Sequence, residues 1–554
     1  MKVAELLVAL LKKHDVKQVF GIPGDAINEM MEAIRTTDDI DFVQVKHEEG
    51  GAFAASIQAK LTGRLSVCMG TSGPGAVHLL NGLYDAKLDH APVLAITGQV
   101  ESQFIGTDYH QEIDTQRLFS DVAVYSQTVT SVEQFPAVIM EACRAAVAHK
   151  SVAHISIPSD VCGQSISFDV NKLNPSAVAG EIMPTSTDCG KAIELLASAK
   201  KTAILVGIGA QHAREELLAL AEKIKAPIVR TLRAKSIIDD LHPLCAGGLG
   251  LLGGKPAIKA FKECDTLLMI GTDFPYQEFY PKNAKVIQVD LDPCQIGKRH
   301  PVDVAVVGHA RSVLQVLYDK LDARQDDKFL SDIQGSMKKW LDDQAKDEHS
   351  DVTPIKPQRL VHEIGLNAPD NAIFVCDTGT INGWAARHLR VKSSQLFTQS
   401  SSLGSMGVGL PGAIGAQFSF PDRPVIALVG DGGLTMTMME LLTAARYELP
   451  IVVIVLNNSR LAFIGMEQQA SGLPPFGIEL NNPDFSAIAN ACGVDSIKVT
   501  EPGEIAEVLY KAMRSSGPIV VDVIIDPDEL IIPPQIETGQ ALNFAKAKVK
   551  EWMG

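Results

Sequence analysis

Short apolar runs that alternate with helical patterns are the feature that most constrains the fold of this 554-residue chain. Runs such as "LSVCMG", "PVLAITG", "KVIQVD" and "PIVVIVL" have the length of strands, and amphipathic segments separate them. Strands that are apolar throughout are typical of parallel sheets covered by helices on both faces. The sequence therefore predicts an α/β fold built from doubly wound parallel sheets.

The chain is longer than one hydrophobic core usually supports, so two to four domains are expected. Two segments without strand-like runs divide it: a polar one from Cys162 and a densely charged, partly helical one from Asp322. We therefore expect three α/β domains, at about residues 1–165, 185–325 and 355–535, followed by a C-terminal tail over 536–554. No internal repeat is visible in the sequence.

The composition argues against several kinds of partner. The formal net charge is −16 and the pI is near 5.4, so neither nucleic acid nor an anionic membrane is expected to bind.

The nine cysteines are scattered and form no CxxC pair, which favours buried, reduced thiols in a cytoplasmic protein. The N-terminal "MKVAELLVALLKKHDV" predicts an amphipathic helix rather than a signal peptide. No apolar run reaches the roughly 18 residues of a transmembrane span.

An acid and two amides follow two consecutive predicted strands. Asp431, in "GDGG", comes after "PVIALVG", and Asn457 and Asn458 follow "PIVVIVL", with the helix "TMTMMELLTAARYEL" between them. A right-handed crossover brings both strand ends to one sheet edge, and neighbouring strands lie about 4.8 Å apart. Asp431 and Asn458 could then hold Mg²⁺, while Gly432 and Gly433 let the backbone approach a diphosphate.

Each motif also fits a purely structural role, with GDGG as a turn and Asn457-Asn458 as a helix cap. The two motifs together, at the ends of two consecutive strands, favour the metal–diphosphate interpretation.

The "GDGG" and "NN" pair resembles the signature of thiamine diphosphate-dependent enzymes, and other landmarks fit over nearly the whole chain. The resemblance is greatest to the pyruvate oxidases, including the quinone-linked bacterial form, within the acetolactate synthase-like enzymes. It implies that Asp431, the Asn458 side chain and the Arg460 main-chain carbonyl bind Mg²⁺. The cofactor-binding residues implied on this side are Gly404, Ser405, Met406, Asp431, Gly432, Gly433, Asn458, Ser459, Arg460, Leu461, Ala462 and Ile464. Met406 would be the apolar wedge that bends the cofactor, although ordinary core packing is its structural alternative.

Glu48, in "VQVKHEEGGAFAA", matches the catalytic glutamate of this family. The resemblance implies that its carboxylic acid shares a proton with the pyrimidine ring nitrogen of the cofactor in a dry pocket. Glu48 and Glu49 would otherwise be helix-start acids, favoured by the helix dipole. Two turns, with Pro23 and Gly24 in one and Gly73 and Gly75 in the other, would wall the cofactor site.

The middle of the chain is predicted to bind a flavin. "AILVGIGAQH" has Gly207 and Gly209 of a dinucleotide turn, but His212 occupies its third glycine position. The segment "GTDFPYQEFYP" resembles the flavin segment of pyruvate oxidase more than that of acetolactate synthase. It implies FAD contacts at Thr272, Asp273, Phe274, Pro275, Tyr276 and the backbone around Gly250. Asp290 ends a predicted strand and could bond ribose hydroxyls, or simply form a turn.

Three further residues match the substrate pocket of the family. Phe463 and Glu467 lie in "RLAFIGMEQQ", where a core phenylalanine on a solvated helix is the alternative. Gln111 is retained in "GTDYHQEIDTQ", but His110 stands where the family usually has phenylalanine. A more polar residue that can be protonated near neutral pH bears on pyruvate specificity and on electron transfer.

The resemblance implies oxidative decarboxylation of pyruvate through a hydroxyethyl-thiamine diphosphate intermediate. Electrons would pass to FAD and then to oxygen or a quinone, giving acetate or acetyl phosphate plus CO₂. A non-redox carboligase resembling acetolactate synthase is the alternative. A non-catalytic cofactor-binding or assembly protein is a third hypothesis, which the retention of Glu48 and of the metal clamp disfavours.

The resemblance also bears on assembly and location. In this family the pyrimidine side and the diphosphate clamp come from different subunits, so we expect a homodimer at least, and a tetramer as the complete assembly. Lys546, Lys548, Lys550 and Trp552 of the tail could touch a membrane surface, but a short solvated helix is favoured. A cytoplasmic protein is expected.

Overall fold

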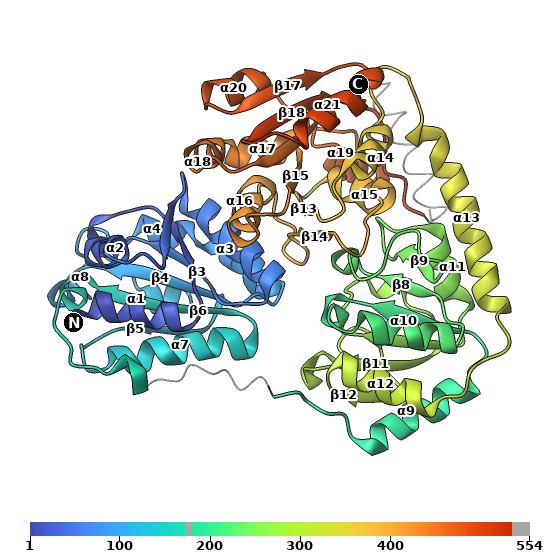
Figure 1. Cartoon of the computed structure of the whole chain (residues 1–554), viewed down its shortest axis with the longest axis horizontal. Helices are drawn as coiled ribbons and strands as arrows, with labels where there is room; N and C mark the ends of the chain where they lie inside the picture. The colour runs from blue at the N-terminus through green and yellow to red at the C-terminus, as the bar shows by residue number, and fades with distance from the viewer. Residues whose placement is uncertain (173–179, 535–554) are drawn as a thin grey trace.

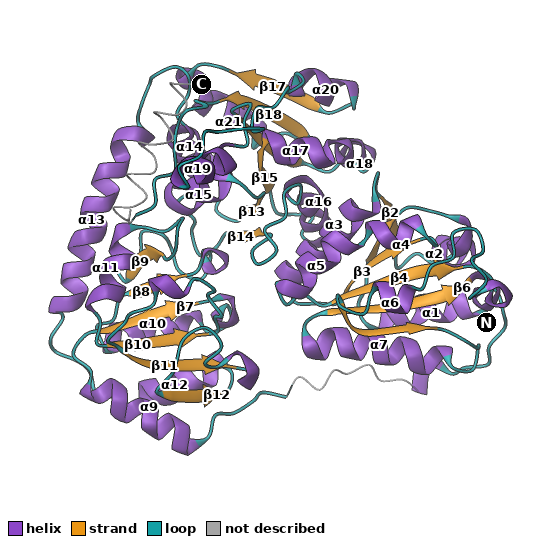
Figure 2. Cartoon of the chain, turned by 180° about the vertical axis from the view of Figure 1, so that it is seen from behind, coloured by secondary structure: helices purple, strands orange, loops and turns teal. Residues whose placement is uncertain are grey.

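The computed structural model of the chain describes residues 1–172 and 180–534. It contains three sheets of six parallel strands, and Figures 1 and 2 show helices on both faces of each sheet. This confirms the predicted doubly wound α/β class. The strands of the three sheets lie within residues 18–158, 202–307 and 373–524. The C-terminal tail, for which a short solvated helix is favoured over membrane contact, lies outside the described residues.

The first sheet has the strand order β2-β1-β3-β4-β6-β5. Alternate residues of its strands face opposite sides: Val67 and Met69 of β3 pack with α1, α2 and α7, whereas Cys68 packs with α3 and α5. Both faces are therefore apolar, as the sequence pattern indicated. The strands are β1 (Gln18–Gly21), β2 (Asp41–Gln44), β3 (Ser66–Gly70), β4 (Val93–Gln99), β5 (Ala123–Thr128) and β6 (Val152–Pro158). The helices are α1 (Val3–Lys13), α2 (Asn28–Arg35), α3 (Glu48–Thr62), α4 (Pro74–His78), α5 (Leu80–Leu88), α6 (Thr115–Leu118), α7 (Phe135–His149) and α8 (Ser159–Cys162).

The middle sheet has the order β12-β11-β10-β7-β8-β9. Counted from its own first strand this is the 3-2-1-4-5-6 order of dinucleotide-binding folds, read from the far edge. The strands are β7 (Thr202–Val206), β8 (Ile228–Arg230), β9 (Cys245–Gly248), β10 (Thr266–Ile270), β11 (Lys285–Asp290) and β12 (Val304–Val307). The helices are α9 (Ser186–Ser198), α10 (Arg214–Lys223), α11 (Lys255–Glu263) and α12 (Ala310–Lys320), and the long helix α13 (Lys328–Glu348) then runs along the molecule toward the third sheet (Figure 1).

The third sheet has the order β14-β13-β15-β16-β18-β17, which is the order of the first sheet when each is counted from its own first strand. The chain thus repeats a fold that no repeat in the sequence indicated. The strands are β13 (Ile373–Cys376), β14 (Leu396–Gln399), β15 (Val425–Gly430), β16 (Ile451–Asn457), β17 (Asp495–Val499) and β18 (Ile519–Ile524). The helices are α14 (Pro357–Asn367), α15 (Thr380–His388), α16 (Gly409–Ser419), α17 (Asp431–Thr437), α18 (Leu441–Arg446), α19 (Ala462–Ala470), α20 (Phe485–Ala491) and α21 (Ile505–Ala512).

Helices α3 and α16 pack the first domain against the third, and glycine lets them approach closely. A Cβ at Gly415 would lie 2.2 Å from the Ala54 carbonyl oxygen, and one at Gly412 would lie 2.7 Å from Ile57. Phe53 and Ile57 of α3 consequently belong to the hydrophobic core of the third domain.

All nine cysteines are free, with Cys294 exposed, Cys492 half-buried and the others buried. Cys294 therefore departs from the expectation of buried thiols. None of the helices in the described part of the chain is both long and apolar enough to cross a membrane.

Candidate functional site

The predicted metal clamp lies at the carboxyl edge of the third sheet. Strands β15 and β16 are parallel neighbours with Gly430 opposite Leu456, so Asp431 and Asn458 follow directly at the same edge. The structure differs from the expected helix, because α17 begins at Asp431 itself and ends at Thr437, before α18. GDGG therefore forms the end of a strand and the first turn of a helix rather than an isolated turn.

Asp431 is 3% exposed and is held by three hydrogen bonds. Its Oδ2 accepts from the Ser459 amide (2.6 Å) and the Asn482 side chain (2.7 Å), and its Oδ1 accepts from the Gly432 amide (2.9 Å). Burial raises the pKa of Asp431, and these hydrogen bonds oppose the rise. No basic side chain forms an ion pair with Asp431 within residues 1–172 and 180–534. A buried carboxylate without a cationic partner suits a bound cation.

The two asparagines at the end of β16 have different roles. Asn457 is the last residue of the strand, and its side chain donates to Asp522 (3.0 Å) and accepts from Asn482 (2.9 Å). Asn458 Oδ1 accepts from the Arg460 amide (3.1 Å) and forms a local turn. Neither asparagine caps α19, whose N-cap residue is Leu461. Sequence analysis missed Asn482, for which a second "NN" pair was the only signal.

The segment 404–406 lies against the clamp because Asp377 fixes the chain that follows it. Asp377, fully buried at the end of β13, accepts from the amides of Gly407 (2.9 Å) and Gly409 (3.3 Å). Burial raises the pKa of Asp377 to about 6, although backbone hydrogen bonds oppose the rise. Met406 is half-buried, and its Cε would lie 3.2 Å from a Cβ at Gly432. The structure thus places Met406 beside the clamp rather than in the core.

Glu48 is the first residue of α3 and is buried, with 7% of its surface exposed. Its Oε2 lies 2.9 Å from Nδ1 of His78, which ends α4, and the imidazole of His47 stacks on that of His78 at 4.3 Å. The N and O ligand atoms of these three side chains all lie within 4.8 Å of one another. Glu48 therefore has a titratable neighbour that sequence analysis missed, although His78 closely follows the predicted turn at Gly73.

Glu49 points to a different partner. The Asn81 side chain of α5 donates both to Glu49 Oε1 (2.5 Å) and to Ser405 Oγ (3.1 Å). Within one chain, Asn81 thus connects the start of α3 with the segment 404–406. Sequence analysis missed this residue as well.

The turns after β1 and β3 pack on each other, as neighbouring strand ends should. A Cβ at Gly24 would lie 2.4 Å from Thr71 Cβ, and one at Gly73 would lie 2.9 Å from the Gln111 carbonyl oxygen. Gly73 also has a φ of +64°, so a side chain there would be strained as well as crowded. Pro23 and Gly75 belong to the same two turns. Gln111 therefore lies beside Gly73, whereas His110 is exposed.

Phe463 and Glu467 lie one helical turn apart on α19, with Phe463 half-buried and Glu467 exposed. The Arg460 side chain points away to Glu479 (3.0 Å) and Asp528 (2.6 Å), which leaves its main-chain carbonyl as the only group it could offer a metal. Ser459 has a φ of +57°, and Ala462 begins α19 after Leu461. Ile464 is 46% exposed.

The predicted flavin residues gather where the strand order of the middle sheet reverses. Gly207 follows β7, and residues 271–276 follow the neighbouring β10. A Cβ at Gly207 would lie 2.3 Å from the Gly271 carbonyl oxygen, and one at Gly209 would lie 2.7 Å from Gly271 Cα. Ligands of open α/β sheets bind at such a point, outside the carboxyl ends of the strands.

Within the flavin segment, Thr272 and Phe274 are buried, whereas Pro275 and Tyr276 are exposed. Gly250, with a φ of +96°, lies against the Phe274 ring, and the Asp273 carbonyl accepts from the Arg299 side chain (3.1 Å). These residues therefore lie together beside the switch point.

Asp290 does not follow the strand after which dinucleotide-binding folds carry their ribose-binding acid. In those folds the ribose-binding acid follows the second strand, but Asp290 ends β11, the fifth strand of this sheet, and Arg230 ends the second. Burial raises the pKa of Asp290, and its Oδ1 accepts from the Asp292 amide (3.1 Å), so the turn interpretation also fits.

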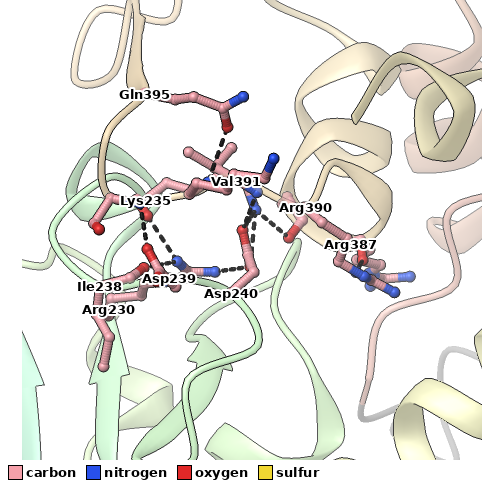
Figure 3. A network of polar contacts seen from close by, with 12 residues as sticks. Arg230, Lys235, Ile238, Asp239, Asp240, Arg387, Arg390, Val391 and Gln395 are labelled. Atoms are coloured by element: carbon pink, nitrogen blue, oxygen red, sulfur yellow. Dashed lines mark hydrogen bonds and ion pairs between the residues drawn. The ribbon is translucent and has the colours of Figure 1, made fainter. Parts of the chain in front are cut away.

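A buried ion network fastens the middle domain to the third (Figure 3). Asp240 pairs with Arg230 and with Lys235 (3.0 Å) and accepts from the Val391 amide (2.8 Å). Burial lowers the pKa of Lys235 to about 8, although Asp240 opposes this effect. Arg387 of α15 donates to the carbonyls of residues 251–253, each at 3.2 Å. Sequence analysis missed this network, which fixes the chain beside Gly250.

Comparison with known families gives one match for each of the three domains. Residues 1–118 match the N-terminal TPP binding domain of thiamine pyrophosphate enzymes, residues 189–317 match their central domain, and residues 377–523 match their C-terminal TPP binding domain.

Full-length relatives give the same result. The chain is 43% identical to the thiamine pyrophosphate-containing protein YdaP of Bacillus subtilis, over 99% of this chain and 96% of the relative. It is 34% identical to the pyruvate oxidase of Lactiplantibacillus plantarum, over 97% and 91%. It is 32% identical to the acetolactate synthase isozyme 2 large subunit of Escherichia coli, over 98% and 100%. The chain therefore belongs to the family of thiamine pyrophosphate-dependent enzymes that includes pyruvate oxidase and acetolactate synthase.

Proposed function

We propose that this chain is a pyruvate oxidase that uses thiamine diphosphate, Mg²⁺ and FAD. It would decarboxylate pyruvate, pass two electrons through FAD to oxygen or a quinone, and release acetate or acetyl phosphate with CO₂. The observation that carries the proposal is the flavin segment, residues 271–276, which lies beside Gly207 at the switch point of a dinucleotide-type sheet. The 34% sequence identity to a pyruvate oxidase, over 97% of this chain, supports the proposal.

The residues of the clamp fit a magnesium ion. Asp431, the Asn458 side chain and the Arg460 carbonyl would supply three hard oxygen ligands, and a diphosphate and water would complete the shell. The ion would neutralise Asp431, which is buried without a basic partner among the described residues. Residues 404–406, with Gly432, Gly433, Ser459, Leu461, Ala462 and Ile464, would line the cofactor.

When bound, thiamine diphosphate supplies the nucleophilic carbon and the electron sink that decarboxylation of a 2-oxo acid requires, and FAD accepts two electrons. Glu48 would hold the proton shared with the pyrimidine ring, because it is the buried acid of its segment whereas Glu49 bonds Asn81. His78 would exchange a proton with Glu48 across their 2.9 Å contact. Gln111, Phe463 and Glu467 would orient the substrate, and the exposed His110 would admit more polar 2-oxo acids.

The residues of the switch point fit a flavin dinucleotide. Gly207 and Gly209 let the turn after β7 pack directly on the backbone at Gly271, and such close packing of turns is typical of the switch point of dinucleotide-binding folds. Tyr276, which is 45% exposed, offers an aromatic surface to a ring system. Thr272, Asp273, Phe274, Pro275, Gly250 and Asp290 would complete the contacts.

The family relationship fits a homo-oligomer. We propose a dimer in which Glu48 of one subunit serves the clamp of the other, and a tetramer of two such dimers. The enzyme would work in the cytoplasm on small 2-oxo acids, with neither nucleic acid nor more than weak membrane contact through its tail.

One anaerobic experiment tests the oxidase assignment. Purified protein with thiamine diphosphate and Mg²⁺ should be yellow, and pyruvate should bleach the flavin absorbance within a turnover. A colourless but active protein, or turnover with a permanently oxidised flavin, would exclude the oxidase.

The second candidate is a non-redox carboligase, which the acetolactate synthase relatives favour. It would use the same clamp and Glu48 but condense two 2-oxo acids. Assay of acetolactate in the same anaerobic mixture separates the two, because an oxidase gives one reduced flavin per CO₂ and a carboligase gives acetolactate. A protein that binds both cofactors and releases no CO₂ would be a non-catalytic binding protein.

A further inference from the structure

Glu440, in the third domain, has a buried carboxylate that contacts the segment just before Glu48. It ends the short helix η8 (Met438–Glu440) and is 2% exposed. Its Oε1 accepts from the amides of Lys46 (2.9 Å) and His47 (3.1 Å), and its Oε2 accepts from the Thr443 hydroxyl (2.6 Å). The two amides belong to the residues immediately before Glu48.

The first turn of α3 is shaped to this carboxylate. A Cβ at residue 50 would lie 2.7 Å from Glu440 Oε1, so only glycine lets the carboxylate come this close. Gly50 has no positive φ, so its missing side chain reflects crowding rather than backbone conformation. The close contact between the two domains thus depends on both partners, on Gly50 in the first domain and on Glu440 in the third.

Tyr447, close to Glu440 in the sequence, also forms hydrogen bonds with β2, the strand that precedes Glu48. The Tyr447 hydroxyl accepts from the Gln44 amide (2.8 Å) and donates to the Phe42 carbonyl (3.2 Å). Residues 440–447 therefore hold the chain from β2 to the start of α3 at successive points. Glu440 is the contact nearest to Glu48.

We propose that Glu440 is a positioning residue for Glu48, which fixes the direction of its carboxyl group by anchoring the two preceding amides. The inference rests on the proposed function in one respect, namely the role of Glu48 in activating the cofactor. Burial raises the pKa of Glu440, while Thr443 and the two amides favour its charged form. Without an acceptor these amides would turn toward other partners, and Glu48 would move with them.

The test compares two substitutions of Glu440. Glu440→Ala removes the acceptor, and Glu440→Gln keeps an amide oxygen that can receive the same backbone donors. The readout is proton–deuterium exchange at the thiazolium carbon of bound thiamine diphosphate, which needs neither pyruvate nor flavin. A catalytic group displaced by about 1 Å can lose about 10²-fold in rate, so we expect up to that loss in Glu440→Ala and less than about threefold in Glu440→Gln.

A double-mutant cycle shows whether Glu440 acts through Glu48. If it does, adding Glu440→Ala to Glu48→Gln slows the exchange no further, because the group that Glu440 positions is already gone. Equal slowing in both backgrounds would overturn the inference. If Glu48→Gln exchanges at the wild-type rate, the proposed role of Glu48 fails instead, and the two failures remain distinct.

A second readout uses the protein without cofactor. Backbone amide exchange of the peptide covering residues 44–50 should accelerate in Glu440→Ala and stay near the wild-type rate in Glu440→Gln. Glu348→Gln is the matched control, because Glu348 is also a buried acid, 3% exposed, that holds His388 (2.8 Å) and Arg390 (2.7 Å) away from Glu48. Unchanged exchange of this peptide in Glu440→Ala, or the same acceleration in Glu348→Gln, would contradict the inference.

Discussion

The first and third sheets share one strand order and present different chemistry at the same edge. In the first, β2 is followed by the acid Glu48, and β3 by the glycine turn that leads to His78. In the third, β14 is followed by residues 404–406, and β15 by Asp431. One edge thus offers a proton donor and acceptor, and the other offers oxygen ligands for a cation.

The difference teaches that topology fixes where a site can lie, whereas the residues at the strand ends decide what it does. In both sheets these residues follow the two strands that flank the first one, namely β2 and β3 around β1 and β14 and β15 around β13, so they lie on either side of the point where the strand order reverses. The third sheet also supplies Glu440, which reaches across to the edge of the first. Glu440 therefore connects the two edges within one chain, and substitutions at the first and third edges should impair different steps.

The largest effect is expected at the first edge. Glu48→Gln keeps the size of the side chain but removes its acid, so folding and cofactor binding should survive. Exchange at the thiazolium carbon should slow by about 10²–10⁴-fold, the usual contribution of a positioned acid–base group.

Glu49→Gln is the control for this prediction, because an amide oxygen can still accept from Asn81. It should exchange near the wild-type rate. Slower exchange in Glu49→Gln than in Glu48→Gln would transfer the role to Glu49, and wild-type rates in both would remove the acid function from this edge.

The next effect is expected at the third edge. Asp431→Ala should weaken thiamine diphosphate binding at limiting Mg²⁺ by at least tenfold, since even partners of a metal ligand commonly contribute about 10–100-fold to metal affinity. FAD binding should be spared, because the predicted flavin residues lie in the middle domain.

Asn482→Ala tests the same edge one contact further out, since Asn482 donates to Asp431. It should shift the Mg²⁺ dependence in the same direction and by less. Titration of cofactor affinity against Mg²⁺ measures both variants. An unchanged Mg²⁺ dependence in Asp431→Ala would locate the clamp elsewhere.

A third effect distinguishes the edges by pH. The pKa of Asp377 is raised to about 6 from 3.8, so its contribution to stability is present below pH 3.8 and is lost as the pH rises through 6. About two pKa units correspond to about 3 kcal/mol, an upper bound for this group. β1, the counterpart of β13, is followed by Ile22, which does not titrate.

Asp377→Asn should therefore gain stability relative to the wild type between pH 4 and pH 8, as followed by urea unfolding. Glu348→Gln should change in the opposite direction and at lower pH. Burial tends to raise the pKa of Glu348, but His388 and Arg390 outweigh it and lower the pKa from 4.5, so the contribution of Glu348 to stability is present above pH 4.5 and is lost as the pH falls below it. Parallel curves for Asp377→Asn and the wild type would show that Asp377 does not titrate in this range.

The sequence predicted the parts of the fold that local patterns determine. Strands such as β4 and β16 are buried throughout and read as apolar runs, whereas β5 and β17 lie at sheet edges, are half-exposed and gave no such signal. Asp431 and Asn458 could be paired because consecutive strands brought them together.

The missing parts of the site depend on contacts between distant segments. Glu440 and Lys46 are 394 residues apart, and Asn81 and Ser405 are 324 apart. No local pattern marks such pairs, because each residue by itself fits an ordinary loop or helix. The same reason hid the repeated fold, since equal strand order requires no similarity of sequence.

The smallest effect is expected where the two edges meet within one chain. Asn81→Ala removes hydrogen bonds to Glu49 and Ser405, while leaving the clamp and Glu48 in place. These bonds are partly exposed, and a hydrogen bond of this kind contributes about 0.5–1.5 kcal/mol, so cofactor affinity should fall by about tenfold or less. Exchange at the thiazolium carbon should change less than in Glu440→Ala, because Asn81 holds Glu49 rather than the amides before Glu48. Isothermal titration with thiamine diphosphate at saturating Mg²⁺ measures the affinity. A loss as large as that of Asp431→Ala at limiting Mg²⁺ would show that the segment around Ser405, rather than the metal clamp, dominates cofactor binding, and the division of roles between the two edges would have to be redrawn.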